Sequence, residues 1–138
     1  MSLEIQDRIS LVKYWIEKAN STFAEAQKVA ETFGYYSLAA NRLYYSLYYA
    51  ATALFLSDNL MCKTHKGVLV QLHKNYVTTG LLTQDEGRLM QKMFIQRQEG
   101  DYEAFVVVTK EDYEEALPQV RNLLDKLIRL NKLNEIDE

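Results

Sequence analysis

The sequence predicts an all-α protein, built as an up-and-down bundle of about five helices. The 138 residues include five glycines and one proline, too few for the turns of a sheet-rich domain of this length. Apolar residues recur three and four positions apart along several long segments, which is the spacing of one helix face. Hydrophobic residues make up 48% of the chain and charged residues 25%, the balance of a folded globular protein. We therefore expect one helical domain over residues 1–138.

The first two segments are the longest. Residues 4–32 carry a single apolar stripe and end just before Gly34, where a left-handed residue is expected. The segment from Tyr36 to Asp58 instead carries apolar or aromatic side chains around nearly its whole circumference. A helix of this kind is buried on two sides. In a domain this small, a second copy of the chain most easily buries the second side, so the pattern predicts a homodimer.

Two shorter helices are expected next. The third covers His65 to Val77, with an inner stripe of apolar residues. Thr83 and Glu86 have the spacing of a capping box and start the fourth helix, which we expect to reach about Glu99. Gly100 then ends it.

The last helix begins at Thr109, with Asp112 three residues on as its capping partner. Pro118 lies inside its apolar pattern and predicts a kink near residues 114–118. The tail from Asn131 is expected to fray. The run from Phe105 to Val108 could be extended, but no partner strand is found elsewhere in the sequence.

Charge and cysteine content limit the class of protein. A formal net charge of −3 excludes a general electrostatic binder of nucleic acid, although a local basic site is compatible with it. Cys62 is the one cysteine, so no internal disulfide can form, as is usual in a reducing compartment. No basic region followed by an apolar run opens the sequence, and the longest apolar stretch, Leu43 to Leu56, is too short to span a membrane. We expect a cytoplasmic protein without a membrane segment.

The first stretch that could carry chemistry runs from Asn41 to Ala50. It contains four tyrosines, whose hydroxyls need partners when they are buried. One interpretation is that they are core and interface aromatics. The other is functional: Arg42, Tyr45 and Tyr49 lie on one helix face and present donors to a phosphate or a base.

The second stretch runs from Lys63 to Gly67, at the start of the third helix. Unpaired backbone N–H groups at a helix N-terminus, beside two lysines and His65, form a candidate anion site. The alternative is that Thr64 is only a helix cap. Cys62 and His65 have the spacing of half a metal site, but His73 is the only other histidine, so we expect neither a metal nor a cofactor.

The third stretch contains Arg97, Asp101 and Tyr102, where Gly100 ends a helix. The structural interpretation is an ion pair between Arg97 and Asp101 that fixes the exit of the chain. In the functional one, Arg97 stabilises charge on a phosphate while Asp101 and Tyr102 position or exchange a proton. No phosphate-binding glycine loop, nucleophile elbow, His-Glu-x-x-His or Cys-x-x-Cys motif is present, which argues against a kinase, serine hydrolase, metalloprotease or dithiol oxidoreductase.

These three stretches, in this order on a helical bundle, resemble the HEPN family, and in particular its small stand-alone members. The resemblance rests on Asn41-Arg42-x-Tyr44-Tyr45-x-x-Tyr48-Tyr49-Ala50, Lys63-Thr64-His65-x-Gly67 and Arg97-x-x-x-Asp101-Tyr102. It covers residues 26–128, and the combined spacing is more specific than any one piece.

The resemblance implies a symmetric homodimer whose polar residues meet at the subunit interface. It also implies a metal-independent ribonuclease, a toxin paired with a small nucleotidyltransferase antitoxin. The family's catalytic signature is an arginine followed, after four to six residues, by a histidine. Arg97 matches the arginine, but no histidine follows it, and Tyr102 stands at the first matching position. Tyrosine and aspartate titrate far from neutrality, so binding of RNA or a nucleotide without turnover is the competing expectation. A third alternative is a pure interaction protein, a dimer that docks a nucleotidyltransferase through its helices.

Overall fold

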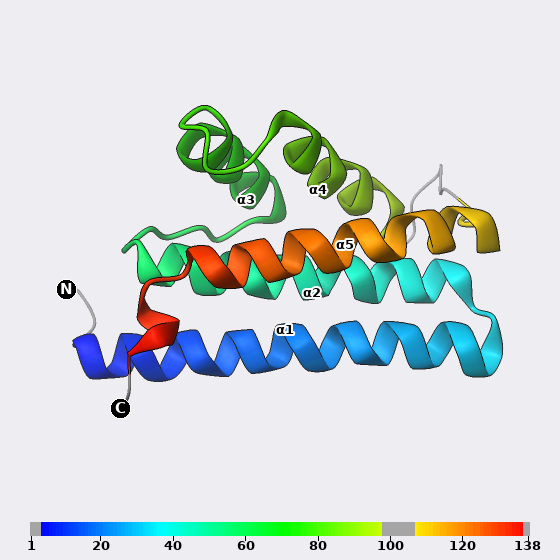
Figure 1. The fold of residues 1–138 in the computed structure, drawn as a ribbon, viewed down its shortest axis with the longest axis horizontal. Coiled ribbons are helices and arrows are strands. Elements are labelled where there is room, and N and C mark those ends of the chain that lie inside the picture. Colours follow the sequence, from blue (N-terminus) through cyan, green and yellow to red (C-terminus); the bar gives the residue numbers. More distant parts are fainter. Residues whose placement is uncertain (1–3, 98–106, 137–138) are drawn as a thin grey trace.

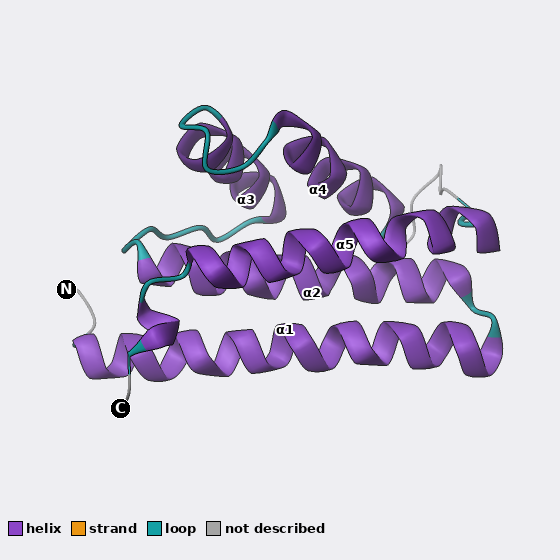
Figure 2. Ribbon diagram, in the orientation of Figure 1, coloured by secondary structure: helices purple, strands orange, loops and turns teal. Residues whose placement is uncertain are grey.

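The computed structural model describes residues 4–97 and 107–136. Over these residues it contains helices and no strand, so the predicted all-α class is confirmed. Three long helices, α1 (Ile5–Phe33), α2 (Tyr36–Ser57) and α5 (Lys110–Leu130), lie along one another (Figure 1). Two short helices, α3 (His65–Leu72) and α4 (Gln84–Gln96), lie obliquely over α2 and α5 as a second layer (Figure 2). Helix α5 begins at the same end of the bundle as α2, so it runs in the same direction as α2 and opposite to α1 (Figure 1).

Helices α1 and α2 form an antiparallel hairpin around a very short connection. Gly34 follows α1 with φ of 66°, the left-handed conformation that glycine adopts without strain. Its backbone N–H donates to the carbonyl of Ala30 and satisfies one of the last carbonyls of the helix. The predicted C-terminal glycine of the first helix is therefore confirmed.

Helix α2 is the central element of the fold. It packs against α1, α4, α5 and α3 of the same chain, so its buried residues face several directions. This explains the apolar circumference of the segment without a second subunit, and the reason given above for a dimer does not hold. The dimer itself stays a prediction, because Tyr45 and Tyr49 are only half-buried here.

The third helical segment changes geometry along its length. Helix α3 ends at Leu72, and His73–Val77 continues as a π-helical turn, η1, instead of the uniform helix expected to Val77. In this turn the N–H of Thr78 donates to the carbonyl of His73, five residues back. The extra residue turns the side chains of η1 relative to those of α3, and Tyr76 and Val77 are both buried.

Both predicted capping boxes are present. Thr83 accepts a hydrogen bond from the N–H of Glu86, and the Glu86 side chain accepts one from the N–H of Thr83. Thr109 and Asp112 exchange the same pair of bonds at the start of α5. Helix α5 continues across Pro118 as one helix, and the kink there stays a prediction.

The tail is anchored as far as the structure describes it, so the expected fraying from Asn131 is wrong. Asn131 is buried, and its side-chain oxygen accepts hydrogen bonds from the N–H groups of Leu133 and Asn134. A short 3₁₀ turn, η2 (Leu133–Glu135), then places Leu133 in an apolar cluster with residues of α1. One buried leucine and an asparagine whose side chain caps the turn hold this end, a pattern too short to be read as a helix in the sequence.

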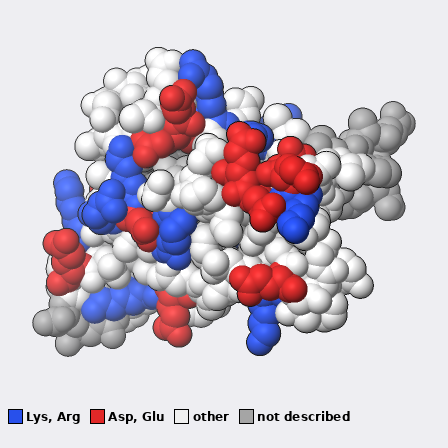
Figure 3. Space-filling view, turned by 45° about the vertical axis from the view of Figure 1, so that its right-hand side comes forward, with Lys and Arg blue, Asp and Glu red and all other residues white. Residues whose placement is uncertain are grey.

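Positive and negative side chains are interspersed over the surface in Figure 3, and neither sign covers that face. This agrees with the small net charge of −3. Among the described residues, no helix combines the length and the apolar character needed to cross a bilayer.

Candidate functional site

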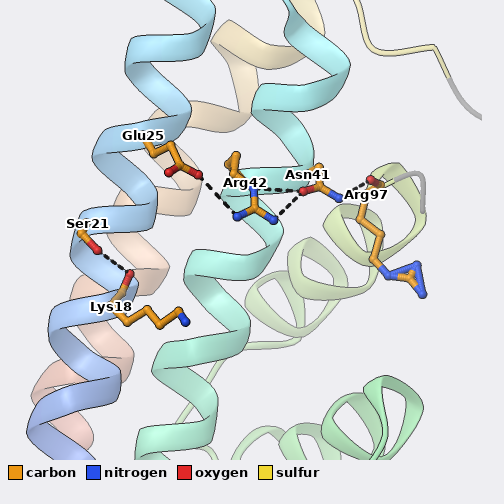
Figure 4. Close-up of polar contacts among 6 residues, drawn as sticks. All are labelled: Lys18, Ser21, Glu25, Asn41, Arg42 and Arg97. Carbon is orange, nitrogen blue, oxygen red and sulfur yellow. Dashed lines mark hydrogen bonds and ion pairs between the residues drawn. The ribbon is translucent and has the colours of Figure 1, made fainter. Parts of the chain in front are cut away.

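A buried asparagine ties the end of α4 to α2. The side-chain nitrogen of Asn41 donates to the main-chain carbonyl of Arg97 over 2.7 Å (Figure 4). Its side-chain oxygen accepts two hydrogen bonds from Arg42, from Nε at 3.0 Å and from Nη2 at 2.9 Å. Arg97 is the C-terminal cap residue of α4, so Asn41 fixes the point at which this arginine leaves the helix. The guanidinium of Arg97 itself points away from Asn41 (Figure 4).

Arg42 is engaged on several sides by its own chain. In addition to Asn41, it contacts the carboxylate of Glu25 in α1 at 3.4 Å. Its guanidinium carbon lies 5.1 Å from the ring centroid of Tyr45, within the range of a cation–π contact. These contacts give Arg42 a local role, that of orienting Asn41. The predicted phosphate contact of Arg42 stays a prediction.

His65 is held by a buried tyrosine. It is the first residue of α3, directly after the cap residue Thr64, whose hydroxyl accepts from the N–H of Gly67 at 2.9 Å. The hydroxyl of Tyr44 and Nδ1 of His65 are 2.8 Å apart, and the side chain of Tyr44 is fully buried. Because the hydroxyl belongs to a buried side chain, the hydrogen bond fixes the orientation of the imidazole. The ring of Tyr48 lies 4.6 Å from the imidazole, centroid to centroid, on a second side.

Arg97 packs against the same two rings as His65. Its guanidinium carbon is 4.3 Å from the ring centroid of Phe94 and 5.9 Å from that of Tyr44. The imidazole centroid of His65 is 5.6 Å from Tyr44 and 6.2 Å from Phe94. Arg97, which is permanently charged, and His65 are distant in sequence but contact the same two aromatic rings. We call these four residues, Tyr44, His65, Phe94 and Arg97, the Arg97–His65 site.

The remaining predicted residues of the tyrosine-rich stretch divide between two places. Tyr45 lies 5.7 Å from the imidazole of His65, edge to face, and so borders the Arg97–His65 site. Tyr49 belongs to another group: it stacks on Trp15 of α1 at 5.4 Å, and Nζ of Lys18 lies 5.1 Å from its ring. The structure therefore does not bring Tyr49 to the Arg97–His65 site.

Of the other predicted site residues, Lys63 is the one that the structure describes. Lys63 is exposed in the loop before α3, and Thr64 acts as the helix cap. Asp101 and Tyr102 lie outside the described residues, as does the expected end of the fourth helix near Glu99. The grouping of Arg97 with Asp101 and Tyr102 stays a prediction.

Tyr48, whose ring lies beside the imidazole of His65, has a raised pKa. Burial raises the pKa of Tyr48, and the nearby Cys62 and Tyr49 raise it further, so Tyr48 keeps its proton near neutral pH. Among the described residues, no three His, Cys, Asp or Glu side chains gather in a way that could hold a metal ion. The thiol of Cys62 instead contacts the carbonyl of Gly67, with its sulfur 3.6 Å away.

Sequence reasoning missed Phe94 as a member of the site, and it named Tyr44 only within the tyrosine-rich stretch. Phe94 stands three residues before Arg97, a spacing that places two side chains side by side on a helix. This spacing could have predicted the contact between the Phe94 ring and the guanidinium. Trp15 and Lys18 have the same spacing on α1, but nothing in the sequence connects them to Tyr49.

Comparison with known proteins agrees with this architecture. The HEPN domain model matches residues 12–131, and the chain belongs to the HEPN family. A "UPF0332 protein" of Thermotoga maritima is 28% identical over 126 residues, which cover 91% of this chain and 95% of that protein. Two proteins of Methanocaldococcus jannaschii are also similar: "Putative toxin MJ0142" is 32% identical over 80% of this chain and 75% of its own length, and "Putative toxin MJ0605" is 29% identical over 81% and 82%.

Proposed function

We propose that this chain is a toxin-like HEPN protein that acts on RNA at the Arg97–His65 site. The observation that carries the proposal is that Arg97 and His65 pack against the same rings, Tyr44 and Phe94. The family signature needs an arginine and a histidine, and no histidine follows Arg97 in the sequence. In our proposal His65, the first residue of α3, takes the place of the signature histidine.

The proposed chemistry needs no metal, because RNA carries its own nucleophile. The 2′-oxygen attacks the adjacent phosphorus and loses its proton to the neutral imidazole of His65, while the bond from phosphorus to the 5′-oxygen breaks. The departing 5′-oxygen takes a proton from water or from the imidazolium. Arg97 donates hydrogen bonds to the phosphoryl oxygens, where negative charge develops. The products are a 2′,3′-cyclic phosphate and a 5′-hydroxyl, so atoms and protons balance.

Asp101 and Tyr102 enter this proposal as positioning groups or proton carriers beside Arg97. We also propose a homodimer and a nucleotidyltransferase antitoxin as partner, as the family resemblance implies. The half-buried Tyr49 and Trp15 and the exposed Tyr14, which is 52% exposed, are aromatic contact residues of the type found at protein interfaces.

A cleavage assay without metal tests the catalytic part. We expect the protein to cleave single-stranded RNA in EDTA, and Arg97→Ala and His65→Gln each to lower the rate at least about 100-fold. Losses of this size are usual for an electrostatic stabiliser and for a general base, respectively. The matched control is His73→Gln, since His73 is the second histidine and lies on η1, whereas His65 begins α3. Equal activity of His65→Gln and His73→Gln would contradict the role of His65.

Binding without turnover is the second candidate function, favoured by the missing histidine after Arg97. It predicts that no RNA is cleaved, while Arg97→Lys still weakens RNA affinity. A lysine keeps the charge but cannot form the two parallel hydrogen bonds that a guanidinium gives a phosphate. Fluorescence anisotropy with a labelled oligonucleotide measures this, and a variant that loses only thermal stability would exclude a phosphate-binding role for Arg97.

A further inference from the structure

A groove runs between the α3–η1 segment and α4, on the outer layer of the molecule. Its volume is about 710 Å³, the size of a substantial binding site. It borders the Arg97–His65 site at Phe94 and otherwise uses none of its residues. A smaller hollow of about 310 Å³ continues it along α4 and shares Arg88, Gln91 and Ile95 with it.

The lining of the groove is mainly aliphatic. Val70 is 61% exposed and Ile95 is 56% exposed, and the two line the groove from facing elements. Leu69, Val77 and Met90 complete the apolar surface between them. The only six-membered aromatic ring in the lining belongs to Phe94. Such a surface suits aliphatic side chains, whereas single-stranded nucleic acid needs several rings on which its bases can stack.

The charged residues of the groove are all basic. Lys66, Lys74 and Arg88 line it together with His73, and no aspartate or glutamate does. The whole chain has 16 basic and 19 acidic residues, so removing these three cations leaves 13 − 19 = −6 for the rest. Arg88 pairs with Asp85 at 2.8 Å, and both side chains are exposed. Lys66 and Lys74 pair with no acidic side chain in the part of the chain that the structure describes.

The π turn contributes to this arrangement. His73, Lys74 and Val77 all belong to η1, and all three line the groove. A π turn costs helical regularity and recurs at functional sites, because it redirects side chains without ending the helix. Here the turn places two basic side chains and one aliphatic side chain in the lining of the groove, across from α4.

We propose that the groove binds an acidic amphipathic helix of a protein partner. The aliphatic side chains of such a helix fill the floor around Val70 and Ile95, and its carboxylates face Lys66 and Lys74. Charge complementarity supports this occupant, since the groove is basic on a chain that is otherwise acidic. Because Phe94 lines both the groove and the Arg97–His65 site, the bound helix lies beside that site. The binding claim does not depend on RNA cleavage.

The test uses two labelled model peptides of about 18 residues, or about five helical turns. Both carry leucine at helical spacing, one with glutamate on the opposite face and one with lysine. In fluorescence anisotropy we expect the full chain to bind the glutamate peptide and to bind the lysine peptide at least about tenfold more weakly. Failure to bind the glutamate peptide, or equal binding of both, overturns the proposal.

Variants locate the binding surface. We expect Lys66→Glu with Lys74→Glu to weaken binding of the glutamate peptide at least about tenfold, and Val70→Asp to do the same. These side chains are exposed, so the fold should survive, which circular dichroism checks. The matched control is Lys28→Glu with Lys132→Glu, an equal change of charge at exposed positions outside the groove.

Each remaining outcome is decisive as well. Equal losses in the groove variant and the control would mean a nonspecific effect of net charge and would refute the site. If the groove variant loses affinity for a single-stranded RNA oligonucleotide but keeps its affinity for the glutamate peptide, the groove is an RNA-binding surface and the proposal is wrong. A groove variant that only shifts the monomer–dimer balance in sedimentation would assign it to a second copy of this chain.

Discussion

The hydroxyl of Tyr44 connects the core to the Arg97–His65 site, so its removal is an informative perturbation. Tyr44→Phe keeps the buried ring, with its contacts to Phe94 and Arg97, and deletes only the group 2.8 Å from Nδ1 of His65. A net hydrogen bond contributes about 0.5–1.5 kcal/mol, and a buried partner left unsatisfied costs about 1–3 kcal/mol. We therefore expect a loss of about 1–2 kcal/mol in the free energy of unfolding.

Urea denaturation measures that loss, and nuclear magnetic resonance of the imidazole reports the orientation of His65. The matched control is Tyr35→Phe, because Tyr35 is 58% exposed and its ring stacks on Phe33. The control should change stability by less than about 0.5 kcal/mol, as is usual for surface positions. If Tyr44→Phe behaves like the control and the His65 resonances do not move, the hydrogen bond does not hold the imidazole.

Three further predictions concern the fold. Asn41→Ala should lower the free energy of unfolding by about 2 kcal/mol, because it removes bonds to a carbonyl and to a guanidinium, whereas Asn122→Ala on the exposed face of α5 should cost little; urea titration compares the two. Burial alone would raise the pKa of Glu86, but hydrogen bonds from Lys126 and from the backbone N–H of Thr83 lower it. The ionised carboxylate therefore stabilises the fold at pH values above the pKa that Glu86 has in the unfolded chain. This stability is lost as the pH falls through the lower pKa of the folded state. Lys126→Met should reduce that acid-range dependence in thermal melts from pH 7 to about pH 3, and an unchanged profile would contradict the assignment. Leu133→Ala should cost about 2–3 kcal/mol if the tail is anchored, and nothing measurable if it frays.

Features specified by neighbouring residues were predictable from the sequence. Gly34 ends α1 in the left-handed conformation, and both threonine capping boxes form, because the partners in each case lie within a few residues of one another. The π turn after Leu72 was not predictable, since the apolar spacing there fits a regular helix as well. The anchored tail depends on contacts between Leu133 and α1, far away in the sequence.

The same distinction applies to the site. The sequence alone singled out Arg97 and His65 as candidates, each in its own stretch. Nothing in their local sequence shows that both pack against Tyr44 and Phe94, because that requires the oblique placement of α3 and α4 over α2. Conversely, the apolar circumference of α2 suggested a second subunit, while the structure accounts for it with four helices of the same chain.

A double-mutant cycle tests most directly whether Arg97 and His65 act as one site. Metal-free RNA cleavage is measured for the natural chain, Arg97→Ala, His65→Gln and the double variant, at one pH and salt concentration. Groups that act as a unit give grossly non-additive effects, so the double variant should be about as slow as the slower single variant. If the logarithms of the two single losses add in the double variant, or if His65→Gln cleaves as fast as the natural chain, Arg97 and His65 do not form a common catalytic site.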